Sequence, residues 1–322
     1  MGRDRKQAPG PAGKRGRDVT GTPVRQEFQN ELGRALRLIR VIPEGPRGRH
    51  ALEAEPLERR LDLVRGVGPR TRERLAQSGY RTLLDLARHP RFGRAATRIS
   101  AALAKRDARA LLAAGARDIE LLPLFGRDEV AVVDIETTGL AQTLPVFLVG
   151  VALWSAGRWE IRQYFARGFE EEAAVLKQVS LELEGRAVCV SYNGKAFDEP
   201  FVRARFRLYG LPPVTFALHV DLLHTCRRRY GAHFPDCRLT TVAGGLLGLV
   251  REGDVPGDQV PDLYYRYVRD GDEAAIAPVI EHNAADLTAL AWLLDALDPR
   301  ALAGGRGAAR EEDPGGEESV PC

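Results

Sequence analysis

The spacing of apolar residues changes along the chain and separates a helical first part from a strand-rich second part. Within residues 26–42, apolar side chains recur three or four positions apart, at Phe28, Leu32, Leu36 and Ile39. This spacing places them on one face of a helix and predicts a helix over the segment. Residues 57–117 read as several short helices, interrupted by turn signals at residues 66–68 and 89–90. We therefore expect a helical region over residues 24–117.

The pattern changes at residue 129. Three apolar or alternating segments rich in β-branched and aromatic residues follow one another, EVAVVDIE, VFLVGVAL and RWEIRQYF, and they predict three successive strands. A helix, a short strand in AVCVSY, a helix from about Phe197, a strand over residues 217–221 and helices to about residue 297 complete the region. Strands first, then strands alternating with helices, indicate an α/β domain with a mixed sheet and flanking helices. We place this domain at residues 120–298, after a small all-α domain.

Composition sets the two ends of the chain apart. Residues 1–23 are Gly, Pro, Arg and Lys with few large apolar side chains, and residues 299–322 are rich in Gly, Glu and Pro. Such segments bury too little apolar surface to offset the entropy of ordering, so we expect a disordered basic arm and a disordered acidic tail. The net charge of +3 is too small to indicate a nucleic-acid partner by itself.

The bulk composition favours a cytoplasmic protein that does not enter a membrane. Apolar residues make up 44% of the chain and charged residues 28%, as in proteins with a buried core. No apolar run is long enough to span a bilayer, and the basic start has no apolar segment typical of a secretion signal. The four cysteines have no framework spacing, so we expect reduced thiols.

Acidic residues at the end of the first strand of the domain are the first candidate chemistry. Asp134 and Glu136 in VVDIETTGL are two positions apart, so alternation sends both carboxylates to the same face of the strand. Two adjacent acids repel each other unless a cation lies between them. Taken alone, the pair is equally consistent with a strand that ends in solvent.

Two further segments carry acids in a suggestive order. In SYNGKAFDEPFV a short strand runs into an Asn-Gly turn, and Asp198 opens a helix, where it could simply cap the helix. In VIEHNAADLTALAWLL, His282 and Asp286 lie four residues apart on one face of a helix, as could also occur on an ordinary surface helix. Two-metal hydrolysis of a phosphodiester needs several carboxylates converging on two ions, and Mg²⁺ prefers such oxygen ligands.

With these three motifs in this order, the chain resembles the DEDD superfamily of 3′→5′ exonucleases, in particular its YprB-like branch with a ribonuclease-H-like fold. The resemblance rests on DIETTGL, VFLVGVA, YNGKAFDEPFV, HVDLLHTCRRRY, RLTTVAGGLLGLVREGDVPGDQVP and HNAADLTAL, and it covers roughly residues 120–297. It implies a two-metal nuclease using Mg²⁺ or Mn²⁺, with a nucleic-acid 3′ end as substrate. It further implies that the metal ligands are Asp134, Glu136, Asp198 and Asp286.

The same resemblance makes His282 the group that orients or deprotonates the attacking water. The histidine of His-type DEDD enzymes lies five positions before the last Asp, whereas His282 lies four before Asp286, which is the Tyr-type spacing. The four acids are therefore better supported than the histidine. Asp221 at the end of another strand is expected to support the metal ligands from behind them. Contacts to the nucleic acid are expected from Thr137, Leu140, Asn193 and Lys195.

A second nucleic-acid contact is expected in front of this domain. LDLVRGVGPRTRERLAQSGYRTLLDLA resembles a helix-hairpin-helix motif, within about residues 57–90. Gly66 and Gly68 would let backbone N–H groups approach a phosphate, with Arg70 and Arg72 supplying charge nearby. An ordinary helix pair joined by a glycine turn would have the same pattern.

Other chemistries are less well supported. His219, His224, Cys226, His233 and Cys237 are close in sequence but do not have the spacing of a zinc site. The chain has no P-loop, dinucleotide fingerprint or nucleophile elbow. Two alternatives stay open: a structure-specific endonuclease of the same fold, and a nucleic-acid-binding module without catalysis.

Overall fold

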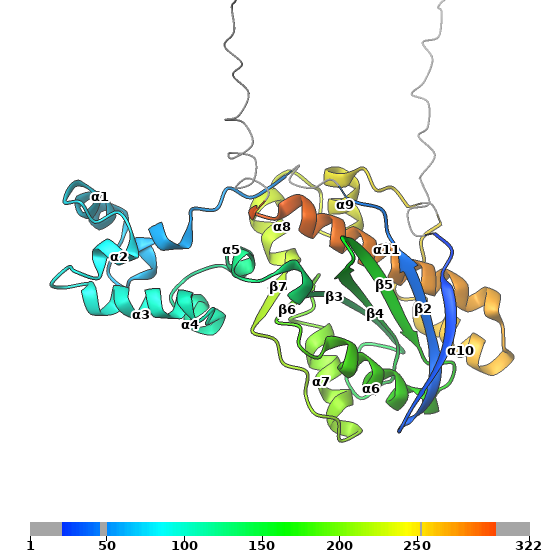
Figure 1. The fold of residues 1–322 in the computed structure, drawn as a ribbon. Coiled ribbons are helices and arrows are strands. Elements are labelled where there is room, and N and C mark those ends of the chain that lie inside the picture. The colour runs from blue at the N-terminus through cyan, green and yellow to red at the C-terminus, as the bar shows by residue number, and fades with distance from the viewer. Residues whose placement is uncertain (1–20, 46–49, 252, 301–322) are drawn as a thin grey trace, which may run out of the picture.

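The computed structural model describes residues 21–45, 50–251 and 253–300. A seven-stranded sheet lies between two layers of helices, and a small group of short helices extends from one side of it (Figure 1). This is the mixed α/β architecture that the strand and helix pattern of residues 129–297 predicts. The expected basic arm and acidic tail fall almost entirely outside the described residues.

The strand order of the sheet is β1-β2-β5-β4-β3-β6-β7, so β3 is an interior strand between β4 and β6. β3 pairs parallel with β6, and β6 pairs parallel with β7, whereas all other neighbours are antiparallel. The strands are β1 Val24–Asn30, β2 Gly33–Val41, β3 Val130–Thr137, β4 Val146–Ser155, β5 Arg158–Phe165, β6 Val188–Ser191 and β7 Leu218–Asp221. The carboxyl ends of β3, β6 and β7 therefore meet at the same edge, where ligands commonly bind in α/β proteins.

The predicted helix over residues 26–42 is wrong. β1 and β2 form a hairpin whose second strand pairs with β5 and so extends the sheet. Leu36 and Leu38 also fit a strand periodicity, and Leu38 is fully buried against the sheet layer. The segment has both periodicities, and pairing with β5 selects the strand because it satisfies backbone hydrogen bonds along a whole edge. The region before the α/β domain is thus helical only from residue 57 onward.

Helices cover both faces of the sheet. On one face α8, α9 and most of α11 pack on Val130 and Val132 of β3, and on the other α6, α7 and α10 pack with Ala131 and Val133. This alternation along β3 is why Asp134 and Glu136 turn toward the α11 face. The helices are α6 Glu172–Leu183, α7 Asp198–Leu208, α8 Leu222–Tyr230, α9 Leu239–Leu247, α10 Val260–Asp270 and α11 Glu273–Leu297.

Gly150 on β4 sets how closely α11 approaches the sheet. A Cβ atom at this position would lie 2.3 Å from Asn283 Oδ1 and 2.5 Å from Leu287 Cδ1. Both distances are shorter than any normal contact, so the absence of a side chain allows α11 to lie directly on the strands. The position of α11 matters because it carries His282 and Asp286.

The short helices between β2 and β3 enclose a small core of their own. Leu61, Val67, Leu75, Leu83 and Phe92 belong to one buried cluster. Two 3-10 turns, η1 Leu57–Arg59 and η2 Leu61–Leu63, precede α1, and 3-10 turns also occur at Leu122–Leu124, Arg127–Glu129 and Phe169–Glu171. The α-helices are α1 Pro69–Gln77, α2 Leu83–Leu86, α3 Gly93–Ala104, α4 Ala108–Ala113 and α5 Asp118–Leu121. None of the helices in the described ranges is long and apolar enough to cross a membrane.

Candidate active site

The carboxyl end of β3 brings the first two predicted acids to the open edge of the sheet. The parallel pairing of β3 with β6 ends at Val132 and Val190, so the two strands separate before Asp134. The pairing of β3 with β4 shifts register between Glu136 and Thr137. Such irregularities end regular pairing and reorient side chains, and they are frequent beside active sites. Asp134 and Glu136 are both partly buried here.

Asp198 reaches the same place from the start of α7. The backbone N–H of Ile135, the residue between Asp134 and Glu136, acts to lower the pKa of the Asp198 carboxyl, so this carboxyl lies beside β3. The preceding turn has Asn193 in the left-handed region, with φ of 66°, a conformation that Asn adopts more readily than most residues. Asp198 is the first residue of α7 and not its N-cap, which is Phe197, and its side chain links the start of α7 to β3.

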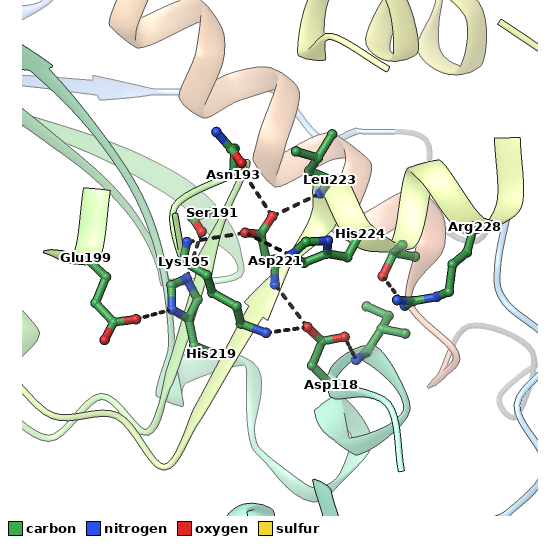
Figure 2. Close-up of polar contacts among 12 residues, drawn as sticks. Asp118, Ser191, Asn193, Lys195, Glu199, His219, Asp221, Leu223, His224 and Arg228 are labelled. Carbon is green, nitrogen blue, oxygen red and sulfur yellow. Dashed lines mark hydrogen bonds and ion pairs between the residues drawn. The ribbon is translucent and has the colours of Figure 1, made fainter. Parts of the chain in front are cut away.

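Asp221 holds this turn from behind, as Figure 2 shows. The side chain is fully buried, and it accepts hydrogen bonds from the backbone N–H groups of Asn193 at 2.8 Å, Lys195 at 3.3 Å and Leu223 at 3.1 Å. These bonds join the end of β7, the start of α8 and the loop that leads to α7. Asp221 thus fixes the backbone that delivers Asp198, a supporting position like the one the sequence suggested.

A third element, α11, supplies His282 and Asp286. His282 Nε2 lies 3.4 Å from Asp286 Oδ2, so the two side chains are neighbours on one helix face. Between them in sequence, Asn283 is fully buried and donates from Nδ2 to Asp134 Oδ2 at 2.7 Å. Asn283 Oδ1 accepts from Gln163 Nε2 of β5 at 2.9 Å. Sequence reasoning missed Asn283 and Gln163, although a buried polar residue between His282 and Asp286 was a usable signal.

The charges of the four acids act on one another, so these side chains lie close together. Burial raises the pKa of Asp134 well above its ordinary value, and the charges of Asp286, Glu136 and Asp198 raise it further. Burial, followed by Asp286 and Asp198, likewise raises the pKa of Glu136. Burial raises the pKa of Asp198 to about 7, with the charges of Asp221 and Asp286 acting in the same direction. Acids on three elements are thus held close together at a cost that a bound cation would remove.

Arg251 and Asp254, in the connection between α9 and α10, add two charged side chains to the site. The sequence alone does not single them out. Arg251 Nη2 lies 2.5 Å from Asp286 Oδ1, and Arg251 Nη1 lies 3.4 Å from Asp254 Oδ2. Asp254 Oδ1 is 2.6 Å from His282 Nδ1. The four side chains form a closed ring beside the acids of β3. Their proximity to one another in space, and not their spacing in sequence, is what identifies Arg251 and Asp254.

The side chains gathered here have the oxygen donors that hard divalent cations prefer. Carboxylate oxygens from four acids are available, and no donor or cation among the described residues acts on Glu136. As the described side chains stand, however, no three His, Cys, Asp or Glu residues surround one point closely enough to hold a metal ion. The Asp286 carboxylate contacts Arg251 through Oδ1 and His282 through Oδ2.

The residues expected to meet a nucleic acid are in different situations. Leu140 is 85% exposed beyond the end of β3, and Thr137 is buried with its hydroxyl donating to Gly139 O at 2.7 Å. Lys195 Nζ lies 2.7 Å from Asp118 Oδ2 of α5 (Figure 2), so its charge is already balanced. Lys195 therefore links the short helices to the α/β domain in this structure.

The other face of β6 and β7 carries a polar chain that also reaches α7. Ser191 Oγ is 2.7 Å from His219 Nε2, and His219 Nδ1 is 3.0 Å from Glu199 Oε2 (Figure 2). These residues line one wall of a cavity of about 320 Å³ beneath α7. Because Glu199 follows Asp198 directly, the chain fastens the first turn of α7 to both strands.

The glycine turn of the expected helix-hairpin-helix segment is present. Gly66 has φ of 90°, Gly68 precedes α1, and Pro69 occupies its first turn. The segment before the glycines forms two 3-10 turns where the motif would have an α-helix. Arg70 is exposed, whereas Arg72 is ion-paired with Glu55.

Three solved structures resemble part of this chain at low TM-scores. The family B DNA polymerase of the hyperthermophilic archaeon Pyrobaculum calidifontis matches with a TM-score of 0.42 and 20% identity, over 52% of this chain and 24% of the polymerase. Two structures of E. coli exonuclease I match at 16% identity, over 54% of this chain and 42% of theirs. They are a zinc-bound complex with single-stranded DNA, with a TM-score of 0.36, and a complex with a dA16 oligonucleotide, with 0.34.

Sequence comparison is more informative. The chain is 31% identical over 170 residues to the uncharacterized protein YprB of Bacillus subtilis (strain 168), and the match covers 52% of this chain and 41% of that protein. The chain thus spans less than half the length of this relative. The sequence model of the RNase_H_2 family, described as RNase_H superfamily, matches residues 131–298. These residues run from β3 through α11, include all four clustered acids and make up just over half of the chain: it belongs to the RNase H superfamily.

Proposed function

We propose that this chain is a metal-dependent 3′→5′ exonuclease that hydrolyses nucleic-acid phosphodiester bonds and releases nucleoside monophosphates. The observation that carries the proposal is the gathering of Asp134, Glu136, Asp198 and Asp286 from three separate elements at one edge of the sheet. A fold gains no stability from crowding four acids together. A functional requirement for a cation is the simplest reason to keep them there.

The same four residues are the expected ligands of two Mg²⁺ or Mn²⁺ ions. Their donor set is all oxygen, and Glu136 and Asp198 carry raised pKa values that bound cations would lower. When bound, such ions lower the pKa of water and stabilise the charge that develops on the phosphate and on the leaving 3′ oxygen. The remaining contributions come from residues of the chain itself.

His282 is placed to orient the attacking water. Asp254, as a carboxylate, can only accept the hydrogen bond at 2.6 Å, so His282 Nδ1 carries a proton, and in the neutral imidazole Nε2, which lies 3.4 Å from Asp286 Oδ2, is then the acceptor. In hydrolysis a bond forms between water oxygen and phosphorus while the bond from phosphorus to the 3′ oxygen breaks. His282 Nε2 can accept the water proton, and the 3′ oxygen leaves as a hydroxyl of the shortened strand.

The short helices between β2 and β3 are proposed to bind the nucleic-acid backbone. Exposed N–H groups around Gly66 and Gly68, together with the exposed Arg70, suit a phosphate and do not read sequence. Leu140 is exposed next to the acids and suits contact with a terminal base or sugar. Two parts of the chain would then hold one strand.

The decisive experiment uses 5′-labelled DNA and RNA oligonucleotides, single-stranded and duplex, with Mg²⁺ or Mn²⁺. The controls are EDTA and the variant Asp134→Asn/Asp286→Asn. A ladder that shortens from the 3′ end, and that is lost in both controls, is the expected result. Internal cuts would instead favour a structure-specific endonuclease. Binding with no cleavage by the wild-type protein would leave a nucleic-acid-binding module and refute the nuclease proposal.

A further inference from the structure

The contact between Arg251 and Asp286 introduces a positive charge into a site made of acids. Arg251 comes from the connection between α9 and α10, and its Nη2 lies 2.5 Å from Asp286 Oδ1. Both side chains are only 16% exposed, so water screens their attraction less than at an open surface. A guanidinium keeps its charge at any pH that a folded protein experiences. Arg251 is therefore a permanent cation beside the candidate metal ligands.

The ion pair with Arg251 and the hydrogen bond from Asn283 hold two of the acids from opposite sides. The ion pair draws Asp286 toward the α9–α10 connection, while Asn283 holds Asp134 on the sheet side. A metal ion and a guanidinium on the same carboxylate oxygen repel each other strongly at such short distances. A metal ion on Asp286 Oδ1 would therefore displace Arg251 from that oxygen.

We propose that Arg251 is an exchangeable counter-ion: it leaves Asp286 when a divalent cation binds, and it then contacts a phosphate of the bound nucleic-acid strand. This inference rests on the proposed nuclease function and adds a residue to it. Arg251 acts first against metal binding and afterwards in favour of substrate binding.

Asp254 keeps the released Arg251 close to the site. It lies 3.4 Å from Arg251 Nη1 and is held in turn by His282 at 2.6 Å. The charge of Asp254 also acts on Glu136, so this second partner is near the acids of β3. The planar guanidinium fork can donate two parallel hydrogen bonds to phosphate oxygens, which a lysine cannot reproduce. Arg251 is thus suited to exchange a carboxylate for a phosphate without leaving the region.

Two binding measurements on the full chain test the proposal, with Arg251→Gln and Arg251→Lys as variants. The first is Mn²⁺ affinity by calorimetry without nucleic acid, where Arg251→Gln should bind about tenfold more tightly than wild type. The second is the affinity of the Mn²⁺-loaded protein for an oligonucleotide whose 3′-terminal linkages are phosphorothioates. There Arg251→Gln should bind about tenfold more weakly, and Arg251→Lys should recover only part of the loss.

Arg238→Gln is the matched control, because this arginine lies before α9 with a side chain that is 83% exposed. It should change neither affinity more than about twofold, as expected for a screened surface charge. Circular dichroism and thermal unfolding establish that each variant is folded. A purely structural role for Arg251 would weaken both affinities, whereas the proposal requires opposite signs.

The outcomes separate this inference from the proposed function. Unchanged or weaker Mn²⁺ binding by folded Arg251→Gln overturns the counter-ion role, even if the wild type is an active nuclease. An absence of Mn²⁺ binding to both wild type and Arg251→Gln overturns the counter-ion role as well. Tighter Mn²⁺ binding with unchanged oligonucleotide affinity overturns the phosphate contact. If both affinities shift as expected but the wild type cleaves nothing, Arg251 keeps its role in binding and only the nuclease proposal fails.

Discussion

Asn283 Nδ2 donates a hydrogen bond of 2.7 Å to Asp134 Oδ2, which joins α11 to β3 at one of the clustered acids. Asn283 is in turn oriented by Gln163, which donates to its Oδ1 at 2.9 Å and to Ile280 O at 2.8 Å. The orientation of Asp134 therefore depends on a polar chain that begins on β5, which is separated from β3 by β4. Buried chains of this kind are effective only when every member is satisfied.

Replacing Asn283 should reduce activity although this residue supports a candidate metal ligand and is not one itself. In Asn283→Leu, Asp134 loses its donor and Gln163 loses its acceptor, which should cost about 1–3 kcal/mol of stability and at least about tenfold in kcat. Asn283→Asp keeps the shape of the side chain but adds a fifth acid. Its Mn²⁺ affinity should therefore differ from that of wild type, and its activity should fall about as much as that of Asn283→Leu. Urea unfolding and single-turnover cleavage measure the two effects. Wild-type activity in a folded Asn283→Leu protein would contradict the positioning role.

Removing the charge of Glu136 should stabilise the metal-free protein while abolishing cleavage. The pKa of Glu136 is raised by burial and by Asp286 and Asp198, so its ionised form is disfavoured in the folded state. In EDTA at pH 8, Glu136→Gln should unfold at a higher temperature than wild type, and its cleavage rate should fall at least about 100-fold. Glu184→Gln, at an exposed position that ends α6, removes a carboxylate outside the acid cluster and serves for comparison. A lower unfolding temperature for Glu136→Gln would contradict the claim that the crowded carboxylates destabilise the metal-free protein.

The metal-free protein should lose stability as the pH rises from 4 toward 7. The folded-state pKa of Asp198 is about 7, above its ordinary value of 3.8, so the folded state binds more protons than the unfolded state in this window. Stability from this group is complete below its unfolded pKa and is lost as the pH rises through the folded one. Thermal unfolding in EDTA should show a smaller pH dependence for Asp198→Asn than for wild type.

The same titration predicts how cations affect stability. Mn²⁺ competes with protons for the acids, so its stabilising effect should be small near pH 5 and larger near pH 8. The increase in unfolding temperature at a fixed Mn²⁺ concentration measures it. An equal increase at both pH values would indicate that the ion binds away from Asp198.

A methyl group at position 150 should displace α11. It would lie 2.3 Å from Asn283 Oδ1 and 2.5 Å from Leu287 Cδ1, and side-chain rotation cannot relieve both contacts, since both side chains are buried. Gly150→Ala should therefore destabilise the fold by about 1–3 kcal/mol and lower activity as well. Gly157→Ala offers a contrast: it lies in a turn with no neighbour within 4 Å, and its φ of 81° makes any loss one of backbone strain with no effect on α11. Equal specific activity of folded Gly150→Ala and wild type would contradict this account.

The exposed Arg70 offers a test of the helical region that leaves the acids untouched. If the glycine turn before α1 contacts phosphates, Arg70→Gln should weaken oligonucleotide binding and reduce the slope of log affinity against log salt by about 1. Mn²⁺ affinity should stay at the wild-type value. Arg81→Gln, beyond the far end of α1, is the matched exposed control. Identical salt slopes for wild type and Arg70→Gln would remove Arg70 from the interface.

The sequence by itself determined the elements from β3 onward and the order of the acidic motifs on them. Strand alternation around Val132 and Val133 is a local property, and it sends Asp134 and Glu136 to one face before any tertiary contact forms. The helical spacing of His282 and Asp286 is local in the same sense. These predictions hold because, in each of these elements, the face that carries the apolar residues is also the face that the fold buries.

Only the tertiary structure decided where periodicity was ambiguous or where partners are distant in sequence. Residues 26–42 fit a helix by their spacing, yet pairing of β2 with the edge of β5 makes most of them part of a hairpin. Asn283 meets Asp134 across 149 residues of sequence, and Arg251 meets Asp286 from a different connection. Such contacts depend on how closely α11 packs on Gly150 and on the path of the chain between α9 and α10. No local pattern encodes them, because their energy arises only when the sheet and its helices have assembled.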